Sequence, residues 1–473
     1  MPDDDLAFQS AVELRRLVAD KQVSPVELTD LYLRRIERID PKLSSYLTVT
    51  GEEAIRDARA AEQAVARGDD LGPLHGVPVS IKDLELTKGT RTTSGSLIYR
   101  DRVPDEDSVV VERVRNAGAV ILGKTNTPEF GLLGRTENRL GDPCGNPWNP
   151  ARTAGGSSGG TAAAIAAGLC ALGTGSDGGG SIRIPAAFCG IYGIKPTQGR
   201  TPHYSGAAAP VAVNLFSQSG PMSRTVRDSA LLLQVLAGYD ARDPGSLQDE
   251  PADYLAMAER GVGGLRIGLS TDFGYAPIDP EVVSAVEHAA GAFEAMGCSV
   301  EPADLTLDSP FDAFWTLFCA VVSARNPSAL TEHREELTEY GREAYEKGAS
   351  ASGADFAAAL GSVDALKAQF AGAFERYDII LTPTVAVPAF PHGQPPATIG
   401  GREVNWFWGY LPHTYPINMI GHPAASIPCG FSSEGLPLGL HIIGRRGDEA
   451  TVISASAAFE AARPWVQRRP PVG

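Results

Sequence analysis

The spacing of apolar and polar residues predicts helices at the start of the chain. Ser24-Pro25-Val26-Glu27 combines a capping hydroxyl, a helix-starting proline and a capping-box glutamate. Apolar residues then recur at positions 28, 31, 33 and 36, and this helical spacing predicts a helix from Pro25 to about Asp40. A second amphipathic segment predicts a helix from Glu52 to Ala66. The first 70 residues are therefore expected to be helical packing.

Short apolar runs further along predict strands. They lie at Val77 to Ile81 and Ala119 to Leu122, with a helical segment from Ser108 to Asn116 between them. Such alternation is typical of an α/β protein. From about Pro251 to Glu375 the pattern is mostly helical around one strand. The later predicted strands and a closing helix lie at 265–270, 379–382, 440–443 and 449–462.

Charge and composition exclude several classes. The 473 residues include 41 Lys and Arg against 57 Asp and Glu, and the resulting formal charge of −16 argues against a nucleic-acid partner. Hydrophobic residues make up 43% of the chain, enough for a large core. The acidic start and the lack of a long apolar run predict a cytoplasmic protein with no membrane segment. Six scattered cysteines without CxxC spacing favour reduced thiols.

Three short motifs match known patterns but lack the required context. Residues 118–125 fit GxxxxGK[ST], yet their interior is a β-type run and no helix start follows. Residues 173–178 fit GxGxxG without a matching acidic residue, and residues 155–159 fit GxSxG without a preceding hydrophobic strand. The eight histidines show no ligand spacing. No metal, nucleotide or organic cofactor is expected.

Three other segments carry the candidate chemistry. They are Gly76–Asp83 (GVPVSIKD), Gly155–Gly160 (GGSSGG) and Gly175–Ala186 (GSDGGGSIRIPA). In this order they resemble the amidase signature family of serine hydrolases, with a pattern closest to stand-alone bacterial amidases, aryl acylamidases and urethane hydrolases. The resemblance continues in four more segments, at 123–129, 146–149, 193–197 and 421–428.

The resemblance implies a triad of Lys82, a cis-serine Ser157 and Ser181. Amide hydrolysis needs a nucleophile, a base, an acid for the leaving nitrogen and donors for the oxyanion. Ser181 is the candidate nucleophile, and no histidine lies in the three motifs. Lys82 must therefore act as the base in its neutral form, which burial favours. Ser157 would relay the proton between Ser181 and Lys82.

The residues around the triad have supporting roles in this interpretation. The N–H groups of Gly178, Gly179 and Gly180 are the candidate oxyanion hole. The family usually has Thr or Ile at the first of these positions, so the bare Gly178 implies a looser loop and a wider pocket. Hydrogen bonds and an ion pair from Ser158, Asp177 and Arg183 are expected to hold the site together. By the resemblance, Gly131 contacts the acyl side of the substrate.

The resemblance also implies the fold. We expect one α/β/α domain over residues 1–473 with a large mixed β-sheet and the triad at its centre. Within it, residues 1–70 would form N-terminal helices and residues 71–230 the catalytic core. Residues 251–375 would border the substrate pocket, and residues 376–473 would return to the core sheet.

The substrate is less well determined by the sequence. Residues 405–415 contain five aromatic side chains, and Phe311, Phe314, Trp315 and Phe318 form a second group. These aromatics either pack in the core or line an apolar pocket. The pocket interpretation predicts that this enzyme, a monomer or homodimer, cleaves aryl amides, with esters and carbamates as further substrates.

Two alternatives remain. One is the glutaminase component of a tRNA-dependent amidotransferase, which shares the triad motifs but has Gln where this chain has Ile184. The other is a catalytically dead binding protein, which the complete triad disfavours.

Overall fold

One mixed β-sheet of eleven strands organises the protein. The computed structural model describes residues 3–204, 206 and 213–472. Across the sheet the strands follow the order β1 (Tyr46–Val49), β3 (Val120–Thr125), β2 (Pro78–Lys82), β6 (Leu172–Asp177), β8 (Gln218–Ser223), β7 (Tyr192–Lys195), β14 (Ala424–Phe431), β15 (Pro437–Gly444), β11 (Ile379–Pro383), β9 (Arg266–Leu269) and β10 (Ser299–Pro302).

Apart from the edge strand β1, which pairs antiparallel with β3, the sheet is parallel near its two ends and antiparallel in its middle. At one end β2 pairs in parallel with both β3 and β6, and at the other end β9 pairs in parallel with both β10 and β11. The strands between them pair antiparallel. Two short hairpin-like pairs lie outside this sheet, β4 (Gly145–Asn146) with β5 (Asn149–Thr153) and β12 (Thr398–Ile399) with β13 (Arg402–Glu403).

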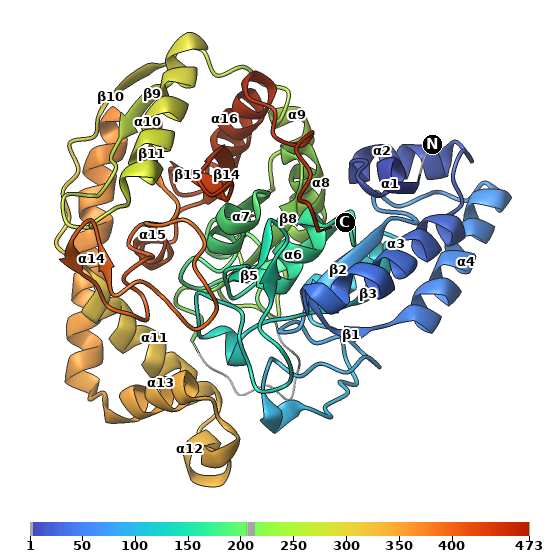
Figure 1. Cartoon of the computed structure of the whole chain (residues 1–473), viewed down its shortest axis with the longest axis horizontal. Helices are drawn as coiled ribbons and strands as arrows, with labels where there is room; N and C mark the ends of the chain where they lie inside the picture. Colours follow the sequence, from blue (N-terminus) through green and yellow to red (C-terminus); the bar gives the residue numbers. More distant parts are fainter. Residues whose placement is uncertain (1–2, 205, 207–212, 473) are drawn as a thin grey trace.

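Alternating side chains of the strands fill a separate core on each face of the sheet. On β11, Ile379 and Leu381 join one core, while Ile380 between them joins the other. This is the two-residue period of a strand that is covered on both faces. Helices therefore cover both faces of the sheet (Figure 1), and the expected α/β/α architecture in a single domain is confirmed.

The N-terminal helices match the sequence pattern closely. α3 (Pro25–Ile39) begins with the predicted capping box, in which Ser24 and Glu27 cap each other's backbone N–H groups. The helix over 52–66 is α4 (Gly51–Arg67), and that over 108–116 is α5 (Val109–Asn116). The other helices of the first half are α1 (Asp3–Ala7), α2 (Ala11–Ala19), α6 (Gly159–Ala166), α7 (Arg183–Cys189) and α8 (Val226–Leu236).

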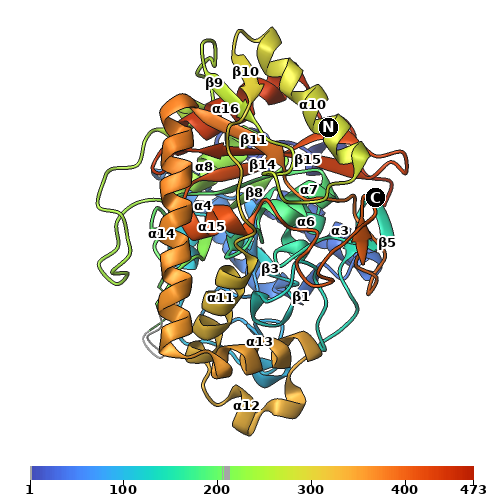
Figure 2. The ribbon, with the colours of Figure 1, turned by 90° about the vertical axis from the view of Figure 1, so that its left-hand side faces the viewer.

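The region from 251 to 375 is mainly helical, as predicted, but contains a second strand. β10 was not expected, because its sequence SVEP is short and largely exposed at the sheet edge. In Figure 2 the long α14 runs down one side of the molecule. The helices of this half are α9 (Tyr254–Met257), α10 (Pro280–Ala295), α11 (Phe311–Arg325), α12 (Ala329–Glu332), α13 (Glu339–Ser350), α14 (Gly353–Arg376), α15 (Tyr415–Ile420) and α16 (Glu449–Ala462).

Among the described residues, short 3-10 helices lie at Asp40–Lys42, Leu97–Tyr99, Glu129–Gly131 and Arg334–Glu336. Within the described ranges, no helix is both long enough and apolar enough to cross a membrane.

Candidate active site

Two neighbouring parallel strands position Lys82 and the residues around it. Lys82 is the last residue of β2, and Ser176 and Asp177 end β6. The two strands pair in parallel, so their carboxyl ends lie at the same edge of the sheet. The Lys82 N–H donates to Thr174 Oγ1 at 3.1 Å, which fixes the end of β2 against β6.

The Lys82 amine is fully buried and has three oxygen partners. Its Nζ lies 2.7 Å from Ser157 Oγ, 2.9 Å from Ser176 Oγ and 3.3 Å from the Ser176 carbonyl oxygen. Burial lowers the pKa of Lys82 to about 7, although the negative charges of Asp177 and Glu85 oppose this shift. Near neutral pH a large fraction of this lysine is therefore uncharged.

Ser157 lies in a tight turn before α6. Its peptide bond with Gly156 is cis, as the resemblance implied. A Cβ atom added to Gly131 would lie 3.2 Å from Ser157 Oγ, so Gly131 is a direct neighbour of this hydroxyl. Thr136 closes the turn from the same side, because its Oγ1 donates to the Gly155 carbonyl at 2.8 Å and accepts from the Gly159 N–H at 3.2 Å.

Ser181 follows the glycine loop after β6 and is 6% exposed. The Ser158 N–H donates to the Ser181 carbonyl oxygen at 3.1 Å, which joins the Ser181 turn to the cis-serine turn. Ser158 also accepts from the Ser176 N–H at 3.3 Å. The structure thus gathers Lys82, Ser157 and Ser181 around the ends of β2 and β6.

The three loop glycines are not equivalent as oxyanion donors. The Gly180 N–H donates to Asp177 Oδ1 at 2.7 Å and is already engaged. The N–H groups of Gly178 and Gly179 have no acceptor among the described residues. Gly180 adopts φ +130°, and a Cβ there would lie 2.5 Å from Thr414 Oγ1, so the position requires glycine.

A buried ion pair stabilises the glycine loop between β6 and Ser181. Arg183 donates from Nε and Nη2 to the two carboxylate oxygens of Asp177, both at 2.9 Å, and both side chains are fully buried. Burial alone would raise the pKa of Asp177, but the charge and hydrogen bonds of Arg183 outweigh it and hold the pKa well below the usual value. The predicted ion pair between Asp177 and Arg183 is therefore present next to the glycine loop.

Three residues that complete this network were not predicted from the sequence. Asn418 on α15 donates to both the carbonyl and Oδ1 of Asp177 at 2.8 Å, and its Oδ1 accepts from Arg183 at 2.6 Å. His441 lies 3.0 Å from Arg183 Nη1, and Thr414 Oγ1 donates to the Gly179 carbonyl at 2.7 Å. These residues lie more than 230 positions downstream, where no short motif points to them.

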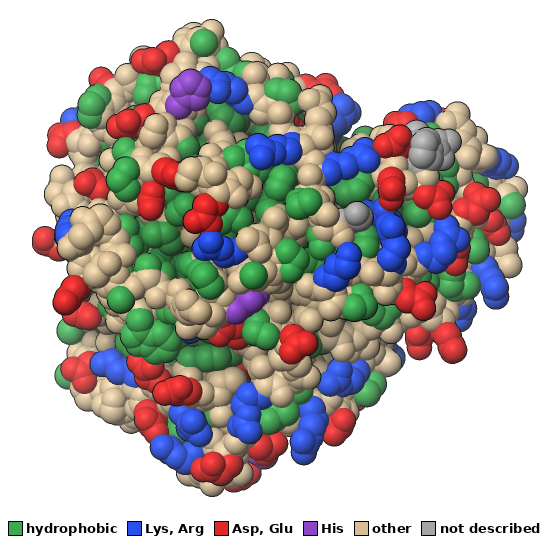
Figure 3. Space-filling view, viewed as in Figure 1, with side chains coloured by type: hydrophobic (Ala, Val, Ile, Leu, Met, Phe, Trp, Pro, Cys, Tyr) green, Lys and Arg blue, Asp and Glu red, His purple; other side chains and the backbone are tan. Residues whose placement is uncertain are grey.

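The two aromatic groups form one cluster against the glycine loop. Ring centroids lie 5.0 Å apart between Phe314 and Trp408 and 5.2 Å apart between Trp315 and Phe407. A Cβ on Gly179 would lie 2.7 Å from the Trp408 ring, so the cluster touches the loop. Most of it is buried core, but apolar side chains also gather on the surface over α15 and the loop before it (Figure 3).

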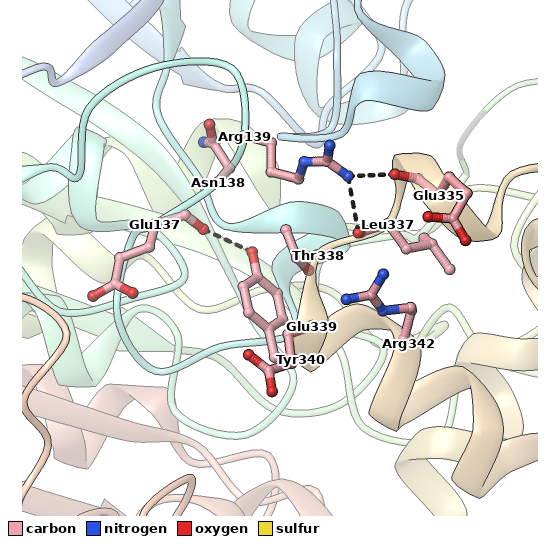
Figure 4. A pocket seen from close by; sticks show the side chains of 9 residues that line it. All are labelled: Glu137, Asn138, Arg139, Glu335, Leu337, Thr338, Glu339, Tyr340 and Arg342. Atoms are coloured by element: carbon pink, nitrogen blue, oxygen red, sulfur yellow. Dashed lines mark hydrogen bonds between the residues drawn. The ribbon is translucent and has the colours of Figure 1, made fainter.

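A separate surface pocket lies away from the triad. It encloses about 390 Å³ and is lined by residues of the 137–139 segment and of the 335–342 segment around the start of α13 (Figure 4). Tyr340 donates to the Glu137 carbonyl at 2.7 Å, and Arg139 donates to the carbonyls of Glu335 and Leu337. No triad residue lines it.

The other motif-like lysine is structural in this fold. Lys124 is buried and donates to Thr87 Oγ1, Thr92 Oγ1 and the Glu85 carbonyl, so it fastens the loop that follows Lys82. All six cysteines are free thiols. In the described part of the chain, no group of three His, Cys, Asp or Glu side chains is placed to hold a metal ion.

The arrangement of a lysine, a cis-serine and a second serine around the ends of β2 and β6 matches the triad that the sequence resemblance implies. The model of the Amidase family matches residues 27–453, and the chain belongs to this amidase signature family. It is therefore an amide hydrolase.

Two similar proteins have different named activities. Over 480 residues the chain is 36% identical to an acylamidase of Rhodococcus erythropolis, covering 99% of this chain and 98% of the relative. It is also 38% identical over 493 residues to a glutamyl-tRNA(Gln) amidotransferase subunit of Moorella thermoacetica, covering 99% of both chains.

Among solved structures, a bacterial aryl acylamidase of the amidase signature family superimposes with a TM-score of 0.90 and 34% identity. The match covers 97% of each chain. The fold and the family are thus shown, whereas the relatives differ in substrate.

Proposed function

We propose that this amidase cleaves aryl and other apolar amides through an acyl-enzyme on Ser181. The observation that carries the proposal is the environment of the Lys82 amine. A neutral amine has two N–H groups and one lone pair, and the two oxygens of Ser176 accept the N–H groups. The lone pair is then left for the Ser157 hydroxyl at 2.7 Å. Lys82 is in this way set to take a proton from Ser157.

The steps follow from this arrangement. Ser181 Oγ attacks the amide carbon and gives its proton to Ser157 Oγ, while Ser157 passes its own proton to Lys82 Nζ. The negative charge on the carbonyl oxygen is stabilised by the free N–H groups of Gly178 and Gly179. The relay then runs in reverse, the leaving nitrogen takes the proton, and the C–N bond breaks. Water hydrolyses the Ser181 ester through the same relay.

The aromatic cluster supports the preference for aryl and apolar groups. It abuts Gly179, whose N–H is one of the proposed oxyanion donors, so a substrate carbonyl bound there would lie close to apolar ring surface. The acylamidase relative and the aryl acylamidase structure agree with this preference. Esters and carbamates, including urethanes, have the same reacting carbonyl and are proposed as further substrates, with Gly131 on the acyl side.

The test is the release of p-nitroaniline from an acyl-p-nitroanilide and of nitrophenol from a nitrophenyl carbamate. Ser181→Ala, Ser157→Ala and Lys82→Ala should each lower the rate by about 10⁴-fold or more. Thr48→Ala, on the edge strand β1, is the matched control and should keep wild-type rates. A serine-directed fluorophosphonate should add its mass to wild type but not to Ser181→Ala. Unchanged turnover by Ser181→Ala would overturn the mechanism.

The glutaminase function is the second candidate, because the amidotransferase relatives are as similar as the acylamidase. Ile184 argues against it. This side chain is fully buried, with its Cδ1 2.6 Å from a Cβ built on Gly180, so it adds apolar surface beneath the loop where the glutaminase pattern has an amide. Hydrolysis of glutamine together with inertness toward anilides would favour the glutaminase.

A further inference from the structure

Arg135 is a buried cation in an ion pair with Glu137, and two of its nitrogens make no hydrogen bond among the described residues. The residue is only 6% exposed, and Nε and Nη1 find no hydrogen-bond acceptor among the described residues. Glu137 Oε1 lies 3.2 Å from Nε without hydrogen-bond geometry. Leaving buried donors unpaired is costly, so such groups usually meet a water, an ion or a ligand.

A second unused donor lies beside it. The hydroxyl of the fully buried Tyr410 has no acceptor among the described residues and lies against the Arg135 side chain, 2.9 Å from a Cβ built on Gly134. Burial raises the pKa of Tyr410 to about 12, although the positive charge of Arg135 and its contact with the phenol oppose this rise. The phenol therefore stays protonated and able to donate, next to the guanidinium.

The segment that carries Arg135 also wraps the cis-serine turn. It starts at Gly131 beside Ser157 Oγ and ends at Thr136, which is hydrogen-bonded to the Gly155 carbonyl. Between them, the backbone of Arg135 lies 2.7 Å from a Cβ built on Gly156. The backbone of the segment that carries Arg135 thus packs against the turn of the proposed relay serine.

An exposed aromatic side chain lies beside Arg135. The Arg135 guanidinium lies over the ring of Trp406 at 5.4 Å, and Trp406 is 44% exposed. Trp406 and Tyr410 belong to the same aromatic loop, 405–415, that abuts the oxyanion glycines. A stacked arginine keeps its in-plane N–H groups available for an acceptor.

We propose that Arg135 and Tyr410 form a substrate subsite that binds an acceptor oxygen, most strongly a carboxylate, carried by the substrate away from the scissile amide. Arginine binds carboxylates in a planar two-point contact, and a phenol adds a third donor. Glu137 offsets part of the charge, so a carbonyl oxygen also fits, but more weakly. This inference rests on the proposed function and narrows its substrates to amides that combine an apolar part with a distal acceptor.

The test compares pairs of anilides that differ only in the acceptor. N-phenylsuccinamic acid against butyranilide probes the acyl side, and 4-acetamidobenzoate against 4-methylacetanilide probes the amine side. In wild type, kcat/KM should favour the acid of one pair by about tenfold or more, as expected for hydrogen bonds to a charged group. Arg135→Met should abolish that ratio, Tyr410→Phe should reduce it, and Arg135→Lys should retain part of it.

Arg139→Met is the matched control, because Arg139 lies in the same segment but is exposed and bonds backbone carbonyls. Its acid-to-neutral ratio should equal that of wild type. A wild-type ratio near one in both pairs would overturn the subsite even if the variants failed to fold, as would an unchanged ratio in folded Arg135→Met. Turnover of neutral anilides without an acid preference would leave the proposed function standing, whereas no turnover of any anilide would contradict that function itself.

Discussion

Ser176 presents both its hydroxyl oxygen and its carbonyl oxygen to the amine of Lys82, at 2.9 and 3.3 Å. This arrangement fits the proposed role of Lys82 as a directed base. A lysine amine on a flexible stem has many orientations, but two acceptors from one residue fix the rotation about its last bond. The remaining tetrahedral direction of the amine nitrogen then faces Ser157 Oγ, the proposed source of the proton.

The first prediction concerns pH. Since only neutral Lys82 can accept a proton and its pKa is lowered to about 7, kcat/KM should rise as pH increases through about 7 and then level off. The measurement is a pH series from 5 to 9.5 with an acyl-p-nitroanilide. Lys195 is also buried with a pKa lowered to about 7, so Lys195→Met is the control and should keep the midpoint. A flat profile would contradict the role of Lys82.

The second prediction concerns Ser176 itself. Ser176→Ala removes the hydroxyl that accepts from the Lys82 amine. Because this hydroxyl also favours the ammonium form, its loss should move the acidic midpoint down by about one pH unit. The plateau rate should fall by about tenfold, since the amine is less well oriented.

Ser176→Thr keeps the hydroxyl and is the matched variant for this experiment. Its midpoint should remain at the wild-type pH. A shift of the midpoint to higher pH in Ser176→Ala would show that the hydroxyl favours the neutral amine instead.

The third prediction uses two neighbouring glycines. A Cβ on Gly179 would lie 2.7 Å from Trp408 and 2.9 Å from Phe314, whereas the nearest atom to a Cβ on Gly178 is 3.6 Å away. Gly179→Ala should therefore displace either the rings or the loop, and lower kcat/KM for anilides by about 10²-fold, the loss typical of a misplaced oxyanion donor. Gly178→Ala keeps its N–H and should lose less than about threefold.

Near-ultraviolet circular dichroism would report the displaced aromatic side chains in Gly179→Ala. Equal rates for the two variants would argue that neither glycine N–H contacts the reacting carbonyl.

The sequence predicted some elements well because their signals are local. The capping box at Ser24 located α3 to within one residue of its end, and the closing helix at 449–462 was found with the observed bounds. β6 was missed, although it is central. Its sequence LGTGSD has little β-propensity, and its place in the sheet depends on pairing with β2 and β8 rather than on its own residues.

In the candidate site, too, some residues have a local sequence signal and others do not. Lys82, Ser157 and Ser181 stand in contiguous motifs and were predicted from a resemblance to known sequences. Asn418 was not, because its contacts with Asp177 span 241 positions and exist only once α15 has packed against the glycine loop. Arg135 gave no sequence signal either, since an arginine in a loop is ordinarily a solvated charge.

The last prediction concerns this long-range contact. Asn418 is fully buried and satisfies the Asp177 carbonyl, Asp177 Oδ1, the Phe216 carbonyl and one Arg183 donor. Asn418→Leu has a similar volume but leaves these groups unpaired, so the free energy of unfolding should fall by about 3 to 5 kcal/mol. Urea denaturation followed by circular dichroism measures the loss. Asn149→Ala, on the exposed start of β5, is the control and should change stability by less than about 0.5 kcal/mol. Wild-type stability in folded Asn418→Leu would mean that water replaces the amide, and that Arg183 and the backbone N–H groups of Gly180 and Ile182 suffice to hold Asp177.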